Sequence, residues 1–246
     1  MYKPKEYLIH SLLFLLTLFT TTLAGGEWIY GKSILASGEA ALTWPYFLKS
    51  LHFSIPFIGI LLVHELGHLF TSIYHKVRCT LPYFIPAWLG FLGSPSLGTF
   101  GAIIRMKGRV NSRKKYFDIG IAGPLAGFVL AFGVLTYGML TLPPADYIYE
   151  IHPEYADPGF QGYGEDVLEF ELGNNLLFWG MGELLADPGR LPQLTELIHY
   201  PYLFAGYLAL FFTALNLLPI GQLDGGHVLF GLFPRRHAQI SLVVFT

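Results

Sequence analysis

Residues 61–70 read LLVHELGHLF, a run in which two histidines and a glutamate interrupt an otherwise apolar sequence. His64 and His68 are four residues apart, so on a helix their rings lie on the same face and can bind one metal ion. Glu65 follows the first histidine directly, where its carboxylate can accept a proton from a water molecule at the metal. The pattern His-Glu-x-x-His therefore predicts a helix that carries a zinc site and a general base.

The composition around this stretch is typical of a membrane protein. Hydrophobic residues make up 53% of the 246 residues and charged residues only 13%, whereas soluble domains have about a quarter charged residues. Ionisable side chains at membrane depth are costly and usually functional. This favours a metal site over histidines that are merely hydrogen-bonded to neighbouring helices. The charge distribution shows no pattern typical of nucleic-acid binding. The one cysteine, Cys79, cannot form an internal disulfide.

Four apolar blocks are long enough to cross a bilayer, whose hydrocarbon core is about 30 Å thick. They comprise residues 7–24, 51–75, 117–142 and 201–233. The first block has an alternative interpretation as a cleaved signal peptide, because Lys3 and Lys5 precede it and small residues follow it. A last apolar stretch, Ile240 to Thr246, is too short to span, so we expect a chain that is truncated at its carboxyl end or lacks a final helix.

The segment from Thr80 to Ile104 is also apolar, but it contains too many prolines and glycines for one continuous helix. Non-helical backbone at membrane depth is tolerated only where protein shields it or water reaches it. We therefore expect a short re-entrant β-hairpin or loop between the second and third spans, with an ordinary interfacial loop as the alternative. The expected fold class is an all-α polytopic membrane protein with about four transmembrane helices and this hairpin.

The basic residues predict the orientation, because cytoplasmic loops carry an excess of Lys and Arg. Under the four-span arrangement one side holds the basic clusters at residues 3–5, 76–78, 105–115 and 235–236. The opposite side holds residues 143–200, an acidic loop whose charge we interpret as a solvated face. The amino terminus is thus predicted to be cytoplasmic and the loop extracytoplasmic. We expect a multi-pass protein of a bacterial plasma (inner) membrane. No transit peptide is evident, but the sequence does not distinguish a plasma membrane from an organelle membrane.

A catalytic zinc needs a third protein ligand and one open position. Asp224, in the segment NLLPIGQLDGGH at the inner end of the fourth block, is the best candidate. His68 and Asp224 precede the next basic residues by about 12 and 16 Å along a helix, so the two side chains are expected at similar depth. The alternative for Asp224 is an interfacial aspartate in a glycine-rich turn. Other histidines are less well placed: His10, His52 and His227.

These motifs resemble those of the site-2 protease family of intramembrane zinc metalloproteases. HELGH at residues 64–68 is similar to the family's first motif, and Asn-x-x-Pro followed by Asp-Gly, within residues 216–225, is similar to its second. GTFGAIIRM and AGPLAG, at residues 98–106 and 122–127, also resemble family segments between these motifs. The resemblance covers residues 52–233, and two motifs in the right order are more specific than either alone.

The resemblance implies a core of three helices in which His64, His68 and Asp224 hold one Zn²⁺ ion. It also implies that Glu65 acts as general base and acid. Asn216 is similar to a family residue that binds the substrate backbone or the oxyanion, and an inter-helix hydrogen bond is the alternative for it. The implied activity is hydrolysis of peptide bonds within or near transmembrane segments of regulatory membrane proteins.

The expected organisation is a single transmembrane metalloprotease domain over residues 1–246, with its core at 51–233 and the acidic loop 143–200 included. Its expected partners are a transmembrane protein substrate and the lipid bilayer, and no feature indicates an oligomeric state. A membrane metal transporter is the alternative function, because the same His and Asp ligands could pass a metal across the bilayer. A transporter would have no need of Glu65 as a base. An inactive scaffold is disfavoured by the intact ligand set.

Overall fold

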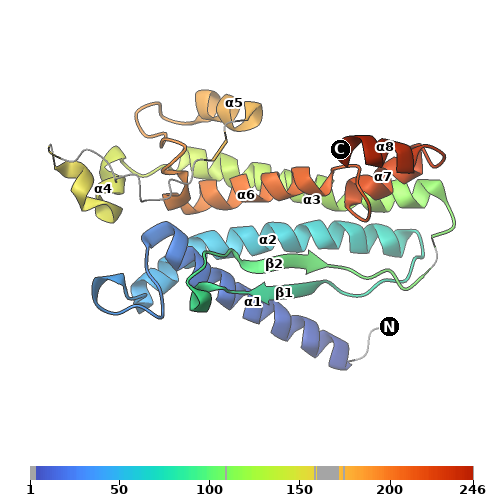
Figure 1. Ribbon diagram of the computed structural model, residues 1–246, viewed down its shortest axis with the longest axis horizontal. Helices are drawn as coiled ribbons and strands as arrows, with labels where there is room; N and C mark the ends of the chain where they lie inside the picture. The colour runs from blue at the N-terminus through green and yellow to red at the C-terminus, as the bar shows by residue number, and fades with distance from the viewer. Residues whose placement is uncertain (1–3, 109, 158, 160–171, 174, 246) are drawn as a thin grey trace.

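The computed structural model describes residues 4–108, 110–157, 159, 172–173 and 175–245. Among them are three helices long and apolar enough to cross a membrane: α1 (Pro4–Tyr30), α2 (Trp44–Tyr74) and α3 (Arg113–Leu140). They confirm the first three apolar blocks as helices. α2 packs against both α1 and α3 and so occupies the middle of the molecule (Figure 1).

The outer face of α1 shows why lipid suits this fold. Leu8, Leu12 and Leu15 each leave more than half of their surface exposed, at 60%, 57% and 59%. A continuous exposed apolar surface of this kind is unfavourable in water and favourable in a bilayer. The protein is therefore an integral membrane protein that is mostly helical.

The fourth apolar block differs from our expectation of one continuous span over residues 201–233. It divides into two helices, α6 (Pro201–Asn216) and α7 (Asp224–Leu232). Between them, Pro219 lacks a backbone N–H and Gly221 has a φ of +52°, and neither is compatible with a regular helix. α6 packs against α2 and α3, and α7 packs against α3. The break therefore sets Asp224 at the start of a new helix beside the core.

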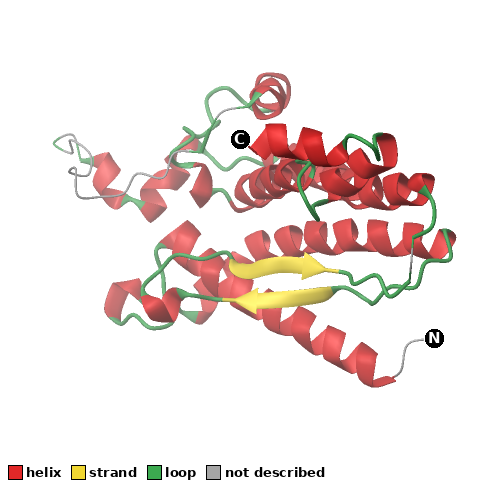
Figure 2. Ribbon diagram, turned by 45° about the vertical axis from the view of Figure 1, so that its right-hand side comes forward, coloured by secondary structure: helices red, strands yellow, loops and turns green. Residues whose placement is uncertain are grey.

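The expected hairpin is present between α2 and α3. Its strands β1 (Tyr83–Ala87) and β2 (Gly98–Ile103) pair antiparallel, with Phe84 opposite Ala102. β1 lies against α1, and β2 lies on the side of α2 in both views (Figures 1 and 2). α1 also fastens β2 directly, because the Thr20 hydroxyl donates a hydrogen bond of 2.7 Å to the Gly98 carbonyl. The hairpin is thus held between α1 and α2.

In its described residues, the segment between α3 and α6 contains short elements only. In order they are η3 (Ala145–Tyr147), α4 (Ile148–Ile151), η4 (Pro153–Ala156), α5 (Leu176–Leu185) and η5 (Leu197–His199). Part of the expected acidic loop, at residues 158, 160–171 and 174, lies outside the described residues. α4 lies at the end of the molecule opposite α7 (Figure 1). A final short helix, α8 (His237–Phe245), follows α7.

Candidate metal centre

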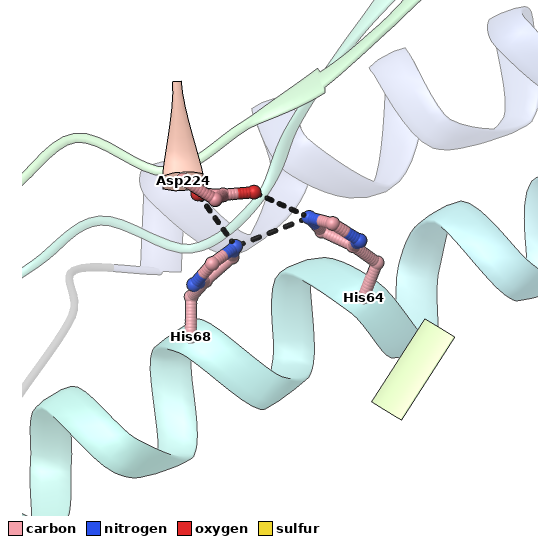
Figure 3. Close-up of side chains that lie close together, drawn as sticks. All are labelled: His64, His68 and Asp224. Carbon is pink, nitrogen blue, oxygen red and sulfur yellow. Dashed lines mark hydrogen bonds and ion pairs between the residues drawn. The ribbon is translucent and has the colours of Figure 1, made fainter. Parts of the chain in front are cut away.

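Two histidines of α2 and one aspartate of α7 come together in the structure (Figure 3). The Nε2 atom of His64 lies 3.1 Å from one carboxylate oxygen of Asp224, and the Nε2 atom of His68 lies 3.2 Å from the other. The two Nε2 atoms are themselves 3.1 Å apart. All three side chains therefore direct potential ligand atoms, within 4.8 Å of one another, at a common point. The structure brings together the three residues that the sequence had suggested as ligands.

The orientation of His68 is fixed from behind by α3. Its Nδ1 atom donates a hydrogen bond of 2.7 Å to the backbone carbonyl of Ile119. With the ring hydrogen on Nδ1, the neutral ring turns the lone pair of Nε2 toward His64 and Asp224. Imidazole nitrogens and a carboxylate oxygen are donors that Zn²⁺ accepts, and the separations suit metal–ligand bonds of about 2.0–2.2 Å. The residues present therefore fit a zinc ion.

Glycines at the contact between α2 and α3 leave room for this arrangement. A Cβ atom at Gly123 would lie only 2.0 Å from the Nε2 atom of His68. A Cβ atom at Gly67 would lie 2.5 Å from the carbonyl oxygen of Ala122. Both distances are far below van der Waals contact, so glycine is required at both positions. The small residues of AGPLAG thus do more than pack two helices, because they leave space for a ligand.

Asp224 is positioned by the tight turn between α6 and α7. It is the first residue of α7, and the residue that follows it, Gly225, packs against the preceding turn. A Cβ atom at Gly225 would lie 2.1 Å from the carbonyl oxygen of Leu217. The Asp-Gly pair therefore lets α7 begin directly over the end of α6, with the carboxylate facing α2.

Glu65 faces two adjoining cavities beside the candidate metal centre. Their volumes are about 520 and 240 Å³, and Glu65 and Asn216 line both. Glu65 is only 8% exposed, and its carboxylate lies near the backbone amide of Ile104, just beyond β2. Asn216 ends α6, and within the described part of the chain its side chain has no hydrogen-bond partner. The inter-helix hydrogen bond considered for Asn216 is therefore not seen there.

The other histidines considered as ligands take different places. The ring of His10 lies 2.8 Å from the Pro82 carbonyl, on the far side of the hairpin. His52 is exposed near the beginning of α2. His227 lines the smaller cavity and stacks on Tyr116, but it does not belong to the group of three.

Sequence analysis did not predict two backbone groups that contact the candidate site residues. The Ile119 carbonyl and the Ile104 amide are backbone atoms, and their contacts depend on how α3 and the hairpin pack against α2. No residue type at either position signals such a role.

Comparisons with known proteins place the chain in a family. The sequence model described as Peptidase family M50 matches residues 52–244. The chain is 32% identical to the probable zinc metalloprotease EGY1, chloroplastic, of Oryza sativa subsp. japonica, over 93% of this chain and 38% of that protein. To the protein of the same name from Arabidopsis thaliana it is 29% identical, over 98% of this chain and 41% of that protein.

A third relative is the probable zinc metalloprotease EGY2, chloroplastic, of Arabidopsis thaliana, at 30% identity over 73% of this chain and 28% of that protein. The chain thus spans about two fifths, or less, of the length of these relatives. No solved structure matches it. Because the family's sequence model covers most of the chain, including both histidines and the aspartate of the centre, the protein belongs to peptidase family M50, the site-2 protease family.

Proposed function

We propose that this protein is an intramembrane zinc metalloprotease that hydrolyses peptide bonds within or near transmembrane segments of other membrane proteins. The observation that carries the proposal is the convergence of His64, His68 and Asp224 beside a buried glutamate and a cavity. Zinc, when bound, supplies Lewis-acid chemistry that makes water a usable nucleophile at neutral pH. No observation favours the alternative of a metal transporter.

The roles of the chain's own residues follow from their positions. His64, His68 and Asp224 would hold the ion through two imidazole nitrogens and a carboxylate. Glu65 would take a proton from the attacking water and deliver it to the nitrogen of the cleaved bond, as a general base and then an acid. The amide of Asn216, at the junction of the two cavities, would donate a hydrogen bond to the substrate carbonyl oxygen.

Replacing Glu65 by Gln tests the proposal directly. Glu65→Gln keeps the size of the side chain but removes the proton acceptor, so cleavage of a transmembrane test peptide should fall by roughly 10²–10⁴-fold. Zinc content, measured by metal analysis, should stay at the wild-type level because no ligand is lost. Preserved cleavage would exclude Glu65 as the base. Metal transport by wild type and variant alike, without cleavage by either, would favour the transporter.

We infer that the substrate binds as an added strand along β2. A helical substrate hides its carbonyl groups in internal hydrogen bonds, so it must open before attack. One edge of β2 is paired with β1, and residues of β2 line the larger cavity between the hairpin and α2. The amide and carbonyl of Arg105 both bond to Thr80, on the β1 side of the hairpin. The amide of Ile104, one residue earlier, therefore faces the opposite side, near Glu65. Backbone groups alternate along a strand, so the Ala102 amide is expected to point the same way and to be open to an extended peptide.

Proline at this position would remove that amide. Ala102→Pro should lower cleavage by roughly tenfold, as expected for about one lost hydrogen bond together with a disturbed strand edge. Zinc content should not change, because no ligand is touched. Ala102→Ser is the matched control, since it alters the side chain and keeps the amide. Equal cleavage by the proline and serine variants, with zinc retained in both, would refute strand addition at this edge.

The arrangement in the membrane is also part of the proposal. α6 is 16 residues long, about 24 Å at 1.5 Å per residue, and it packs along α2 and α3. This supports α6 as a fourth crossing in one domain that includes the segment between α3 and α6. The basic clusters support a cytoplasmic amino terminus.

The identity of the membrane stays a prediction. The sequence led us to expect a bacterial plasma membrane, whereas the plant relatives carry chloroplastic names. Localisation of the full chain with a fluorescent tag in its native cell would decide between the two.

A further inference from the structure

A second group of two histidines and a carboxylate lies in the segment between α3 and α6. The Nε2 atom of His152 is 3.1 Å from the Nε2 atom of His199. The latter is 3.6 Å from a carboxylate oxygen of Glu196. As at the first centre, the potential ligand atoms of the three residues all lie within 4.8 Å of one another. We call this set the outer group.

The outer group is remote from the candidate catalytic centre. His199 lies just before the first residue of α6, and Asp224 follows the end of this helix. The 16 residues of α6 separate the two places by about 24 Å. One metal ion cannot serve both groups.

Hydrogen bonds fix how the two rings of the outer group are oriented. The Nδ1 atom of His199 donates to the backbone carbonyl of Ile29, at the end of α1, over 2.6 Å. The Nδ1 atom of His152 donates to the carboxylate of Glu154 over 3.1 Å. Both acceptors lack hydrogen, so both Nδ1 atoms must carry one. In the neutral rings the two Nε2 atoms then present lone pairs to each other.

Two lone pairs at 3.1 Å, with a carboxylate beside them, repel unless a positive charge lies among them. A shared proton is one solution and a metal ion is the other. The geometry favours the ion, because a third donor, the Glu196 carboxylate, faces the same point as the two rings. A metal ion with two positive charges also neutralises the negative charge of Glu196. A single proton shared by the two rings carries only one positive charge and does so less completely.

The carboxylate of the outer group is held in the same manner. The Tyr155 hydroxyl donates a hydrogen bond of 3.0 Å to one oxygen of Glu196, and the other oxygen faces His199. Each of the three side chains is therefore oriented by a further contact, which is how metal ligands are commonly held in proteins. Two imidazoles and one carboxylate are typical ligands of Zn²⁺ and similar transition metals, whereas Ca²⁺ and Mg²⁺ prefer oxygen alone.

We propose that His152, Glu196 and His199 bind a second divalent transition-metal ion of the zinc class. The ion joins the turn after α4 to the entrance of α6, and through the Ile29 carbonyl to the end of α1. Its function is structural, because it fastens the segment between α3 and α6 to the helices that carry the catalytic centre.

Zinc stoichiometry of the full chain tests the proposal. Purified protein in detergent is equilibrated with Zn²⁺, desalted and analysed for zinc per chain. Wild type should hold two ions, and H64A/H68A, which removes the histidines of α2, should hold one. H152Q should also hold one, and the combination of all three substitutions none. His52→Gln is the matched control and should keep two ions, because His52 is exposed and packs against Tyr202 at the same end of α6.

The decisive sample is the H64A/H68A variant, in which the outer group is unchanged. If folded H64A/H68A binds no zinc, the proposal is overturned, whatever the fate of H152Q. If H152Q does not fold, Glu196→Gln takes its place. Co²⁺ added to H64A/H68A should give visible absorption bands of the bound ion that disappear in the triple variant. Bands that persist there, or a loss of zinc in His52→Gln equal to that in H152Q, would show surface binding and overturn the proposal.

Discussion

The catalytic centre and the outer group use the same donors in different surroundings. Both combine two imidazoles with one carboxylate, both have their Nε2 atoms 3.1 Å apart, and both contain a histidine that donates to an isoleucine carbonyl. Among the described residues, it is the centre on α2 that has a buried glutamate beside a ligand and a large cavity lined by an edge strand. Under the two proposals above, similar ligand sets serve a reaction in one place and the structure in the other, depending on what adjoins them.

Removal of the carboxylate from the catalytic centre should give the largest effect. Asp224→Ala leaves two imidazoles for the ion, so cleavage should fall to background and the zinc of this centre should be lost on desalting. Zinc analysis beside a cleavage assay measures both. Asp187→Ala is the control, because its exposed carboxylate pairs with Arg190 and accepts a hydrogen bond from the Gly189 amide, both at the surface. Cleavage by Asp224→Ala at the wild-type rate would remove the distinction between the two groups.

A methyl group placed between the two helices should have the next largest effect. Gly123→Ala would bring a Cβ atom within 2.0 Å of the His68 Nε2 atom, so we expect zinc affinity and cleavage to fall by at least about 10–100-fold, as when an orienting contact is lost. Gly133→Ala, on the same helix with nothing within 4 Å, should behave as wild type. Zinc competition titration and cleavage rates give the comparison. Similar values for the two variants would mean that α3 does not shape the centre.

A smaller effect is expected from an orienting contact of the outer group. Glu154→Gln weakens the acceptor for the Nδ1 hydrogen of His152 and should lower zinc affinity by roughly 10–100-fold. The measurement is a zinc competition titration in the H64A/H68A background, where the catalytic ion is absent. Glu150→Gln, an exposed glutamate on the neighbouring helix α4, should leave the affinity as it was. An unchanged affinity for Glu154→Gln would argue that His152 is not a ligand.

The sequence was most informative where spacing along one element carried the signal. His64, Glu65 and His68 lie within five residues of one helix, and the hairpin between α2 and α3 followed from its prolines and glycines. Hydropathy failed at the fourth block because it averages apolar character and is insensitive to a turn. Pro219 and Gly221 break that block, yet the return of the chain still places Asp224 beside the histidines.

The outer group could not be predicted from spacing along the sequence. Glu196 and His199 are three residues apart around the 3₁₀ turn η5, and His152 is 47 residues away from His199. Glu-x-x-His spacing occurs in metal-binding helix bundles, but this short pattern does not identify a site without its distant third ligand. The acidity of the segment suggested a solvated face. The contact with the Ile29 carbonyl joins positions 170 residues apart. Only the tertiary structure brings these groups together.

The close approach of α2 and α3 has a consequence for how a substrate enters. At Gly67 the two backbones meet with no room for a methyl group, and the same stretch of α3 supplies the carbonyl that orients His68. Separating these helices would break the contact that orients His68, so we expect them to stay together. Gly93 and Gly101 of the hairpin, by contrast, have positive φ and open space around them. Under the proposed function, a transmembrane substrate is therefore expected to enter on the hairpin side of the protein.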